Sequence, residues 1–355
     1  MTGKLKMIFV GALTAVISLT LVTMGNPPNM GFCIACFLRD TAGALKLHSA
    51  AVAQYVRPEI IGVVFGALIT SKLSGGFAAK GGSAFLTRFV LGMCVMIGAL
   101  IFLGCPLRMV LRIAGGDLNA VVGLVGFAAG IFLGVFFLNN GFSLKRTYNV
   151  SNTDGLVLPS LCLLLLIAVI FAPAILAFST EGPGAAHAPL YYSLTAGIIM
   201  GVAGYISRLC FIAGIRDSVL FRDFSMLSAF ITIAVVGAIG NIFFGRFNLG
   251  FASQPIAHTD GLWNFLGLAL VGFGSVLLGG CPFRQLILAG SGNSDSTTAV
   301  LGMIFGAAIA HNFSLASSAN GVTGNGKVGF ALAVAVAIFI AVYNTYFNRN
   351  VGENS

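Results

Sequence analysis

Charged residues are scarce in this chain. Only 29 of its 355 residues (19 basic and 10 acidic) are Lys, Arg, Asp or Glu, which is 8%, whereas soluble domains carry about 25%. This scarcity excludes a soluble globular fold, because a water-exposed surface needs far more charge. Hydrophobic residues make up 57% of the chain and form long blocks, unlike the alternating segments of about 10 residues in an outer-membrane barrel. The composition therefore predicts an all-α polytopic membrane protein with one transmembrane domain, 1–355.

Several functional signatures are also missing. No Gly-x-x-x-x-Gly-Lys-Ser/Thr loop appears, which argues against a self-contained ATP-driven pump. The chain has one Cys-x-x-Cys pair and four scattered histidines, so we expect neither a metal site nor a cofactor. The net charge of +9 comes from basic residues dispersed between apolar blocks, as in cytoplasmic loops, which argues against nucleic acid as a partner.

Long uncharged stretches are abundant. A membrane helix needs about 20 apolar residues to cross a hydrocarbon core of about 30 Å. Nine stretches without Asp, Glu, Lys or Arg are long enough, with 19 or more residues each. A tenth block, 60–71, is only 12 residues long and spans only if Glu59 and Lys72 reach the two interfaces. We therefore expect about ten (nine to ten) transmembrane helices, with no buried carboxylate in any of them to relay protons. The nine stretches of 19 or more residues without Asp, Glu, Lys or Arg are 7–38, 89–107, 118–144, 155–180, 182–207, 224–245, 261–283, 296–326 and 328–348.

The basic residues indicate the orientation in the membrane. If the first helix starts inside, twelve of the nineteen Lys and Arg residues, among them Arg349, fall in inner segments. Cytoplasmic loops are enriched in these residues, so we expect both termini in the cytoplasm. The apolar run after Lys4 and Lys6 is followed by Gly-Asn-Pro-Pro at 25–28 and not by a small-residue cleavage site. We interpret this run as a retained helix.

Two motifs occur twice in the same order. Residues 104–108, Gly-Cys-Pro-Leu-Arg, recur 176 positions later as Gly-Cys-Pro-Phe-Arg. A Cys-x5-Arg-Asp motif at residues 33–40 recurs 177 positions later. These matches divide the chain into a first repeat, 1–178, and a second repeat, 179–355. Each copy holds five expected spans, an odd number, so the copies should be inverted, as in many secondary transporters whose sites lie on interrupted helices.

The Gly-Cys-Pro motif predicts a half-helix. Proline suits the first position of a helix, so the preceding cysteine would be the cap. The helix would end near Ala114 or Ala289 after some nine residues, or roughly 13 Å, about half of a bilayer core. Such re-entrant helices place a positive helix N-terminus, a thiol and a first-turn arginine, Arg108 or Arg284, inside the protein beside a cavity. This arrangement favours an anion.

The thiols indicate which anion. A neutral thiol is a weak and polarisable donor, poorly matched to a hard oxyanion and better matched to a terminal sulfur or selenium atom. We therefore expect a soft anion as the substrate and no enzymatic activity. Arg39 with Asp40, and Arg216 with Asp217, either form charge-compensating pairs or contact the anion. The candidate pathway residues are Cys33, Cys36, Cys105, Cys210, Cys281, Arg39, Arg108, Arg216 and Arg284.

With these motifs the chain resembles the YeeE/YedE family of sulfur-transport membrane proteins, and more closely its YedE branch of selenium transporters. The resemblance covers most of the chain. It implies a bacterial inner (plasma) membrane permease for thiosulfate or a selenium analogue, whose cysteines pass the ion along by thiol–sulfur hydrogen bonds. By motif, Cys105 and Cys281 match the two loop cysteines, and Cys33 or Cys36 matches the N-terminal one. The family also implies nine spanning helices and a cytoplasmic sulfur-carrier protein as a partner.

Two other functions fit the same residues. A membrane thiol-disulfide oxidoreductase would use Cys33 and Cys36 as a redox pair and would need a quinone or a partner thiol. A channel for a small hard anion would not need sulfur chemistry and would tolerate Cys→Ser substitutions. Cys94 and Cys162 lie outside both motifs, and we interpret them as packing residues. The expected lack of a carboxylate in the spans favours uptake driven by metabolism.

Overall fold

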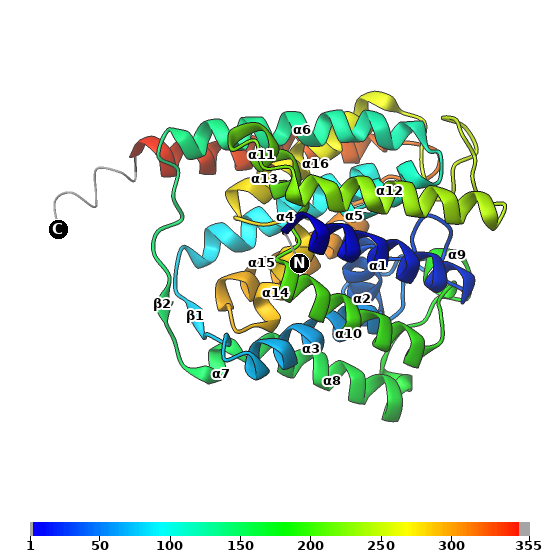
Figure 1. Ribbon diagram of the computed structural model, residues 1–355, viewed down its shortest axis with the longest axis horizontal. Helices are drawn as coiled ribbons and strands as arrows, with labels where there is room; N and C mark the ends of the chain where they lie inside the picture. The colour runs from blue at the N-terminus through cyan, green and yellow to red at the C-terminus, as the bar shows by residue number, and fades with distance from the viewer. Residues whose placement is uncertain (1–2, 348–355) are drawn as a thin grey trace.

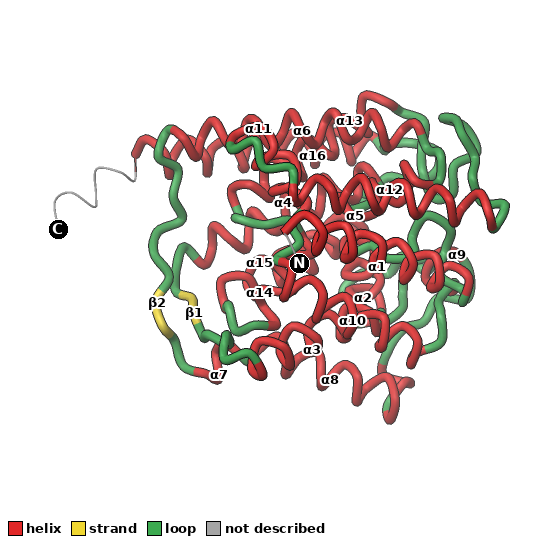
Figure 2. The backbone as a smooth tube through the Cα atoms, viewed as in Figure 1, coloured by secondary structure: helices red, strands yellow, loops and turns green. Residues whose placement is uncertain are grey.

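The computed structural model describes residues 3–347, and this part of the chain is mostly helical (Figure 1). Apolar blocks become helices because their backbone N–H and C=O groups find no water in a hydrocarbon core and bond one another along the helix. Many of the long helices run across the view in Figure 2. The fold is the all-α polytopic membrane protein that the composition predicts. Arg349 and residue 348, the end of the last apolar stretch, lie outside the described residues.

The first half of the described chain contains helices and two short strands. The two strands pair with each other in antiparallel orientation. The elements are α1 (Gly3–Thr23), α2 (Ile34–Ala44), α3 (Pro58–Leu73), β1 (Lys80–Gly81), α4 (Phe85–Phe102), α5 (Pro106–Ala114), α6 (Leu118–Asn139), β2 (Tyr148–Asn149), α7 (Asn152–Gly155), α8 (Val157–Phe171) and the 3-10 helix η1 (Pro173–Ile175).

The second half of the described chain is built from helices and loops. Its elements are α9 (Gly182–Ala185), α10 (Leu190–Ser207), α11 (Phe211–Leu220), α12 (Ser225–Phe243), α13 (Gly261–Leu277), α14 (Pro282–Gly290), α15 (Ser294–Asn312), α16 (Gly324–Val342) and the π-helix η2 (Tyr343–Phe347).

Seven helical segments within residues 3–347 are long and apolar enough to cross a membrane. Three of them are a long helix followed by a short one, namely α4 with α5, α10 with α11, and α13 with α14. The others are α1, α6, α12, and α16 with η2. The expected count of about ten is therefore not confirmed. α8 has 15 residues and α3 has 16. At about 1.5 Å per residue α3 is roughly 24 Å long, short of a 30 Å core. The 19-residue α15 begins with the polar segment 294–298.

The short block at 60–71 forms α3, which extends over both of its flanking charges. Lys72 lies near the end of the helix with its ammonium 5.6 Å from the centroid of the Phe77 ring. Glu59 does not reach an interface: its side chain is completely buried in the first turn. The condition set for this block to span, that both flanking charges reach the interfaces, is therefore not met at Glu59, because buried polar partners hold its carboxyl group inside the protein.

Helices of the two halves pack in matching pairs. α3 packs along α10 and α1 along α12, while α6 packs along α13 and α4 along α15. Glycines permit these close approaches. A Cβ atom added at Gly130 in α6 would lie 1.9 Å from the Ala269 carbonyl oxygen of α13, and one added at Gly66 in α3 would lie 2.2 Å from the Ile198 carbonyl oxygen of α10. The two halves therefore share one core.

Candidate functional site

The first sulfur cluster lies where the N-termini of α2 and α5 meet. Cys33 caps α2, and its sulfur accepts a hydrogen bond from the Cys36 backbone N–H at 3.4 Å. Cys105 caps α5, with Pro106 at the first position and Ala114 at the end, as the sequence predicts. The Cys33 thiol donates to the Cys105 sulfur at 3.9 Å.

Backbone N–H groups of both helices lie next to the Cys105 sulfur. One belongs to Arg108 in its own helix, and the other belongs to Ala35 in α2. Because a helix N-terminus carries a partial positive charge, two helix dipoles point toward this sulfur pair. Cys33, Cys36 and Cys105 are all buried, so the first cluster is closed to solvent in this structure.

Arg108 is buried beside this cluster without a carboxylate partner among the described residues. Its Nη1 donates to the Cys36 sulfur at 3.3 Å and also to the Leu103 carbonyl oxygen. Its other nitrogens donate to backbone carbonyls, Nε to Asn29 and Nη2 to Ile256, each at 3.1 Å. The guanidinium charge is therefore held by oxygen dipoles and a thiol, and it is directed at the cysteines.

The other buried arginines of the first half are paired with carboxylates. Asp40 accepts from Arg39 at 2.6 Å and from Arg57 at 2.7 Å, and the three side chains are almost completely buried. Arg112 pairs with Asp117 at 2.6 Å, and both are buried. Of the two roles expected for Arg39, the structure shows the charge-compensating pair.

The second sulfur cluster repeats the arrangement of the first. Cys210 caps α11 and Cys281 caps α14, again with proline, Pro282, at the first position. The two thiols are adjacent and interact directly. The Cys210 sulfur lies next to backbone N–H groups at the start of α11, and the Cys281 sulfur lies next to those of Phe211 and Arg284. Unlike the first cluster, this one is partly open, because Cys210 is half-buried.

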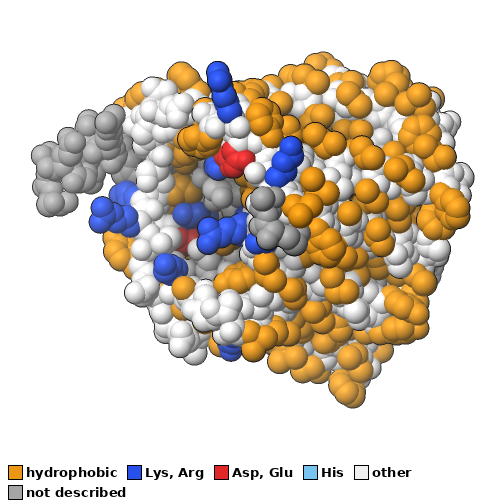
Figure 3. Space-filling model, in the orientation of Figure 1, with side chains coloured by type: hydrophobic (Ala, Val, Ile, Leu, Met, Phe, Trp, Pro, Cys, Tyr) orange, Lys and Arg blue, Asp and Glu red, His pale blue; other side chains and the backbone are white. Residues whose placement is uncertain are grey.

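A small cavity of about 170 Å³ opens on the second cluster. At about 30 Å³ per water, it has room for about five waters, which suits a small ion. Its lining contains Cys210, the glycine turn before Cys281, and the side chains of Arg208, Arg216 and Arg284. Figure 3 shows Lys and Arg side chains gathered around a hollow on a face that is otherwise largely hydrophobic.

Two of the three cavity arginines have no carboxylate to neutralise them. Arg216 pairs with Asp217 at 2.7 Å, and both side chains are partly exposed. Within residues 3–347, neither the Arg208 nor the Arg284 side chain makes a hydrogen bond or an ion pair. Unpaired guanidinium groups beside a thiol in a cavity of this size provide an anion-binding site.

The sequence motifs did not identify Arg208. It lies two residues before Cys210, outside the Cys-x5-Arg-Asp motif, and the corresponding position 177 residues earlier is Gly31. The sequence did contain a signal for Arg208: a basic residue stands beside the motif in the second copy, where the first copy has glycine. Arg208 ends α10 in the left-handed backbone conformation, with φ 58°, which turns the chain toward the cavity.

The two remaining cysteines belong to neither cluster, and neither is exposed. Cys94 and Cys162 are buried within α4 and α8. All seven cysteines are free. The described part of the chain contains no group of three or more His, Cys, Asp or Glu side chains that could hold a metal ion.

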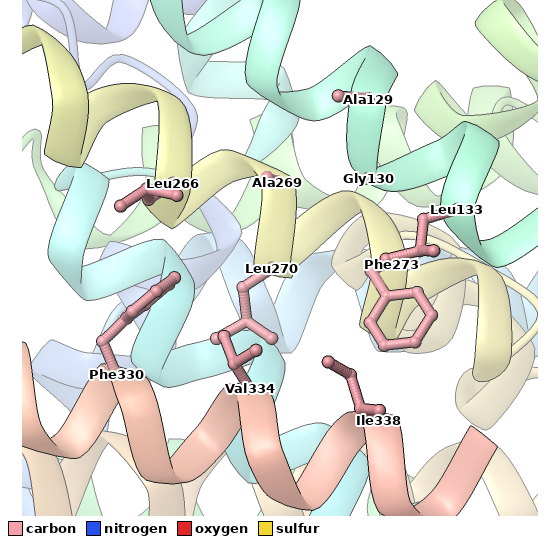
Figure 4. A pocket seen from close by; sticks show the side chains of 10 residues that line it. All are labelled: Ala129, Gly130, Leu133, Leu266, Ala269, Leu270, Phe273, Phe330, Val334 and Ile338. Carbon is pink, nitrogen blue, oxygen red and sulfur yellow. The ribbon is translucent and has the colours of Figure 1, made fainter. Parts of the chain in front are cut away.

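A larger cavity of about 220 Å³ lies between α6, α13 and α16 (Figure 4). Its lining is entirely apolar and includes Leu270, Phe273 and Phe330. Without a donor or a charge this cavity cannot balance an anion, so it is no part of the candidate site.

The family model described as Sulphur transport matches residues 206–349. The matched region includes the second sulfur cluster and its arginines, Arg208, Arg216 and Arg284. No curated protein matches the chain.

Proposed function

Because residues 206–349 match a sulfur-transport family, in support of the resemblance to YeeE/YedE proteins, we propose that this chain is a permease for a small sulfur- or selenium-containing anion. The anion is thiosulfate or a selenium analogue of it. It passes through a central path lined by cysteine thiols, in two steps at the two sulfur clusters.

The observation that carries this proposal is the paired cysteines at converging helix N-termini. In each cluster, two thiols meet where two half-helices begin. A thiol can donate to the terminal sulfur of thiosulfate, and backbone N–H groups and helix dipoles stabilise the negative charge. A hard anion would be stabilised by the helix dipoles, but the thiols would add little to its binding.

The cavity arginines support a division of roles at the second cluster. Arg208 and Arg284 bind the oxyanion end of the substrate by charge-assisted hydrogen bonds. Cys210 and Cys281 bind its terminal sulfur. Arg216 contributes less, because Asp217 already neutralises it. At the first cluster Arg108 has the role of the cavity arginines, next to Cys36.

The two clusters belong to two inverted repeats, 1–178 and 179–355. The main helix pairs support this relation: the contact of α3 with α10 has its counterpart in that of α12 with α1, and the contact of α6 with α13 has its counterpart in that of α15 with α4. In Figure 1, α1 runs from left to right and α16 from right to left, as expected if both termini lie on one side. We assign that side to the cytoplasm and the protein to the bacterial inner membrane.

The competing functions are less well supported. Cys33 and Cys36 are both completely buried, which leaves no surface at which a partner thiol could attack a disulfide between them. A hard-anion channel does not explain two cysteine pairs at equivalent caps. A soluble sulfur-carrier protein is a candidate recipient of the substrate on the cytoplasmic side.

Uptake of radiolabelled thiosulfate into proteoliposomes tests the proposal. Cys105→Ala and Cys281→Ala should each abolish uptake, because each removes the donor that recognises the terminal sulfur. Cys94→Ala and Cys162→Ala are matched controls, since they remove buried cysteines outside the clusters and should retain uptake. A labelled selenium analogue measured in the same preparation gives the selectivity.

The outcomes separate the three functions. Full uptake by both Cys105→Ala and Cys281→Ala would refute the thiol mechanism. Retained transport in the corresponding Cys→Ser variants, with no preference for thiosulfate over formate, would indicate a hard-anion channel. A disulfide between Cys33 and Cys36 that turns over with substrate, detected by mass spectrometry, would indicate an oxidoreductase.

A further inference from the structure

Glu59 is a buried carboxyl group directly before the short apolar block 60–71. It lies in the first turn of α3 and is completely buried. Its Oε1 accepts hydrogen bonds from Asn26 at 2.9 Å and from Ser193 of α10 at 3.0 Å. Its Oε2 is buried without any hydrogen-bond partner in the described chain. An ionised carboxylate in this position lacks a partner for half of its charge.

The charged groups around Glu59 come from the neighbouring elements. Arg57, just before α3, donates to Asp40 of α2 at 2.7 Å and contacts the Asn26 side chain at 3.5 Å. Arg39 of α2 completes the group through Asp40. With Glu59 ionised, two arginines face two carboxylates and the cluster is neutral. With Glu59 protonated, the cluster carries one positive charge.

Other titratable groups near Glu59 are neutral at physiological pH. Tyr55 and His187 interact electrostatically with Glu59, and their rings stack on each other at 3.9 Å. Burial raises the pKa of Tyr55 to about 12 and lowers the pKa of His187 below its ordinary value. Among the other elements that pack on α3, α8 has no charged residue, and the arginine of α14, Arg284, interacts with the second sulfur cluster instead.

The cluster is joined to the first sulfur site by hydrogen bonds. The Asn26 amide that donates to Glu59 also donates to the Gly31 carbonyl oxygen at 3.2 Å, in the loop that leads into Cys33. Arg39 interacts electrostatically with both Cys33 and Cys36. The charge state of Glu59 therefore changes the electrostatic potential at the place where the anion would bind.

We propose that Glu59 is a proton-binding site that couples proton entry to anion uptake. A proton on Glu59 leaves the Arg39–Asp40–Arg57 cluster with a net positive charge, which favours an anion at Cys33 and Cys105. By linkage the bound anion favours the proton equally. Proton and anion therefore bind together and are released together, so the protein is a symporter.

The inference rests on the proposed function and is tested in the same proteoliposomes. Addition of thiosulfate to wild-type vesicles should move protons inward, reported by a pH-sensitive dye. An inward gradient of one pH unit should raise thiosulfate accumulation by about tenfold for each coupled proton. In Glu59→Gln both effects should disappear, while exchange of labelled for unlabelled thiosulfate continues. Glu181→Gln, at an exposed glutamate, is the control and should behave like wild type.

A second measurement needs no variant. Thiosulfate binding to the detergent-solubilised wild-type protein in weakly buffered solution should take up about one proton per bound anion. Thiosulfate uptake and binding without proton movement, or wild-type proton movement in Glu59→Gln, would overturn the inference and leave the proposed function intact. Failure of the wild-type protein to take up thiosulfate would overturn the proposed function itself.

Discussion

The sulfur atoms of Cys33 and Cys105 lie 3.9 Å apart although 72 positions separate the two residues in the chain. Each residue caps a half-helix, so the pair lies where α2 and α5 begin. Cys210 and Cys281 form the same arrangement at α11 and α14. The same two local motifs thus build two sulfur sites, of which the first is buried and the second is partly exposed.

Cys210 should be the first cysteine to react with a membrane-impermeant maleimide. It is the half-buried member of the seven cysteines and borders the arginine-lined cavity, whereas the other six are buried. Mass spectrometry of the labelled protein should find the adduct at Cys210, and thiosulfate should slow its formation. Cys210→Ala should remove the fast reaction. Labelling of Cys94 or Cys162 ahead of Cys210 would contradict the open second cluster.

Arg284→Gln and Arg208→Gln should each raise the KM for thiosulfate uptake by about tenfold or more, because a hydrogen bond to a charged group contributes roughly 1.5–3 kcal/mol. Arg284→Lys should restore part of the loss, since the charge is kept. Arg146→Gln, at an exposed loop arginine, should leave the KM unchanged. Equal effects of all these neutralisations would point to general surface charge instead of a site.

Asp40→Asn should strongly destabilise the protein. Asp40 is the shared partner of Arg39 and Arg57, and its loss leaves two buried guanidinium groups uncompensated. Removal of one partner from a buried ion pair costs about 3–5 kcal/mol. Thermal unfolding in detergent should show a lower Tm than for Glu181→Gln, which removes an exposed charge. An unchanged Tm would mean that this charge cluster does not stabilise the fold.

Gly130→Val should also lower the Tm in detergent. The added Cβ atom would meet the Ala269 carbonyl oxygen at 1.9 Å, so α6 and α13 would have to separate. Overpacking of this kind costs about 1–3 kcal/mol or more. Gly261→Ala is the control, because no atom lies within 4 Å of its added Cβ. Equal stability of both variants would contradict the close packing of the two halves.

Features that depend on neighbouring residues could be predicted from the sequence. The order Cys-Pro predicted that Cys105 and Cys281 cap helices, and the half-helix end near Ala114 was correct. The second half-helix ends at Gly290, one residue beyond the expected Ala289. Capping depends on local backbone geometry and on proline, so the amino-acid sequence contains this information.

Features that depend on distant residues could not be predicted. The sequence left open whether Glu59 reaches an interface, because its partners, Asn26 and Ser193, lie 33 and 134 positions away. From the sequence, Arg208 could not be distinguished from other arginines of cytoplasmic loops. In the structure, the turn at the end of α10 places it in the same cavity as Arg284.

The sequence by itself determined the membrane setting, the helical class and the duplicated cysteine caps, because hydropathy and capping are properties of short segments. The tertiary structure alone decided which charges are neutralised. It brought Arg57 to Asp40 and left Arg208 and Arg284 without a carboxylate, because ion pairing inside a low-dielectric core depends on distances of a few ångströms that only packing fixes.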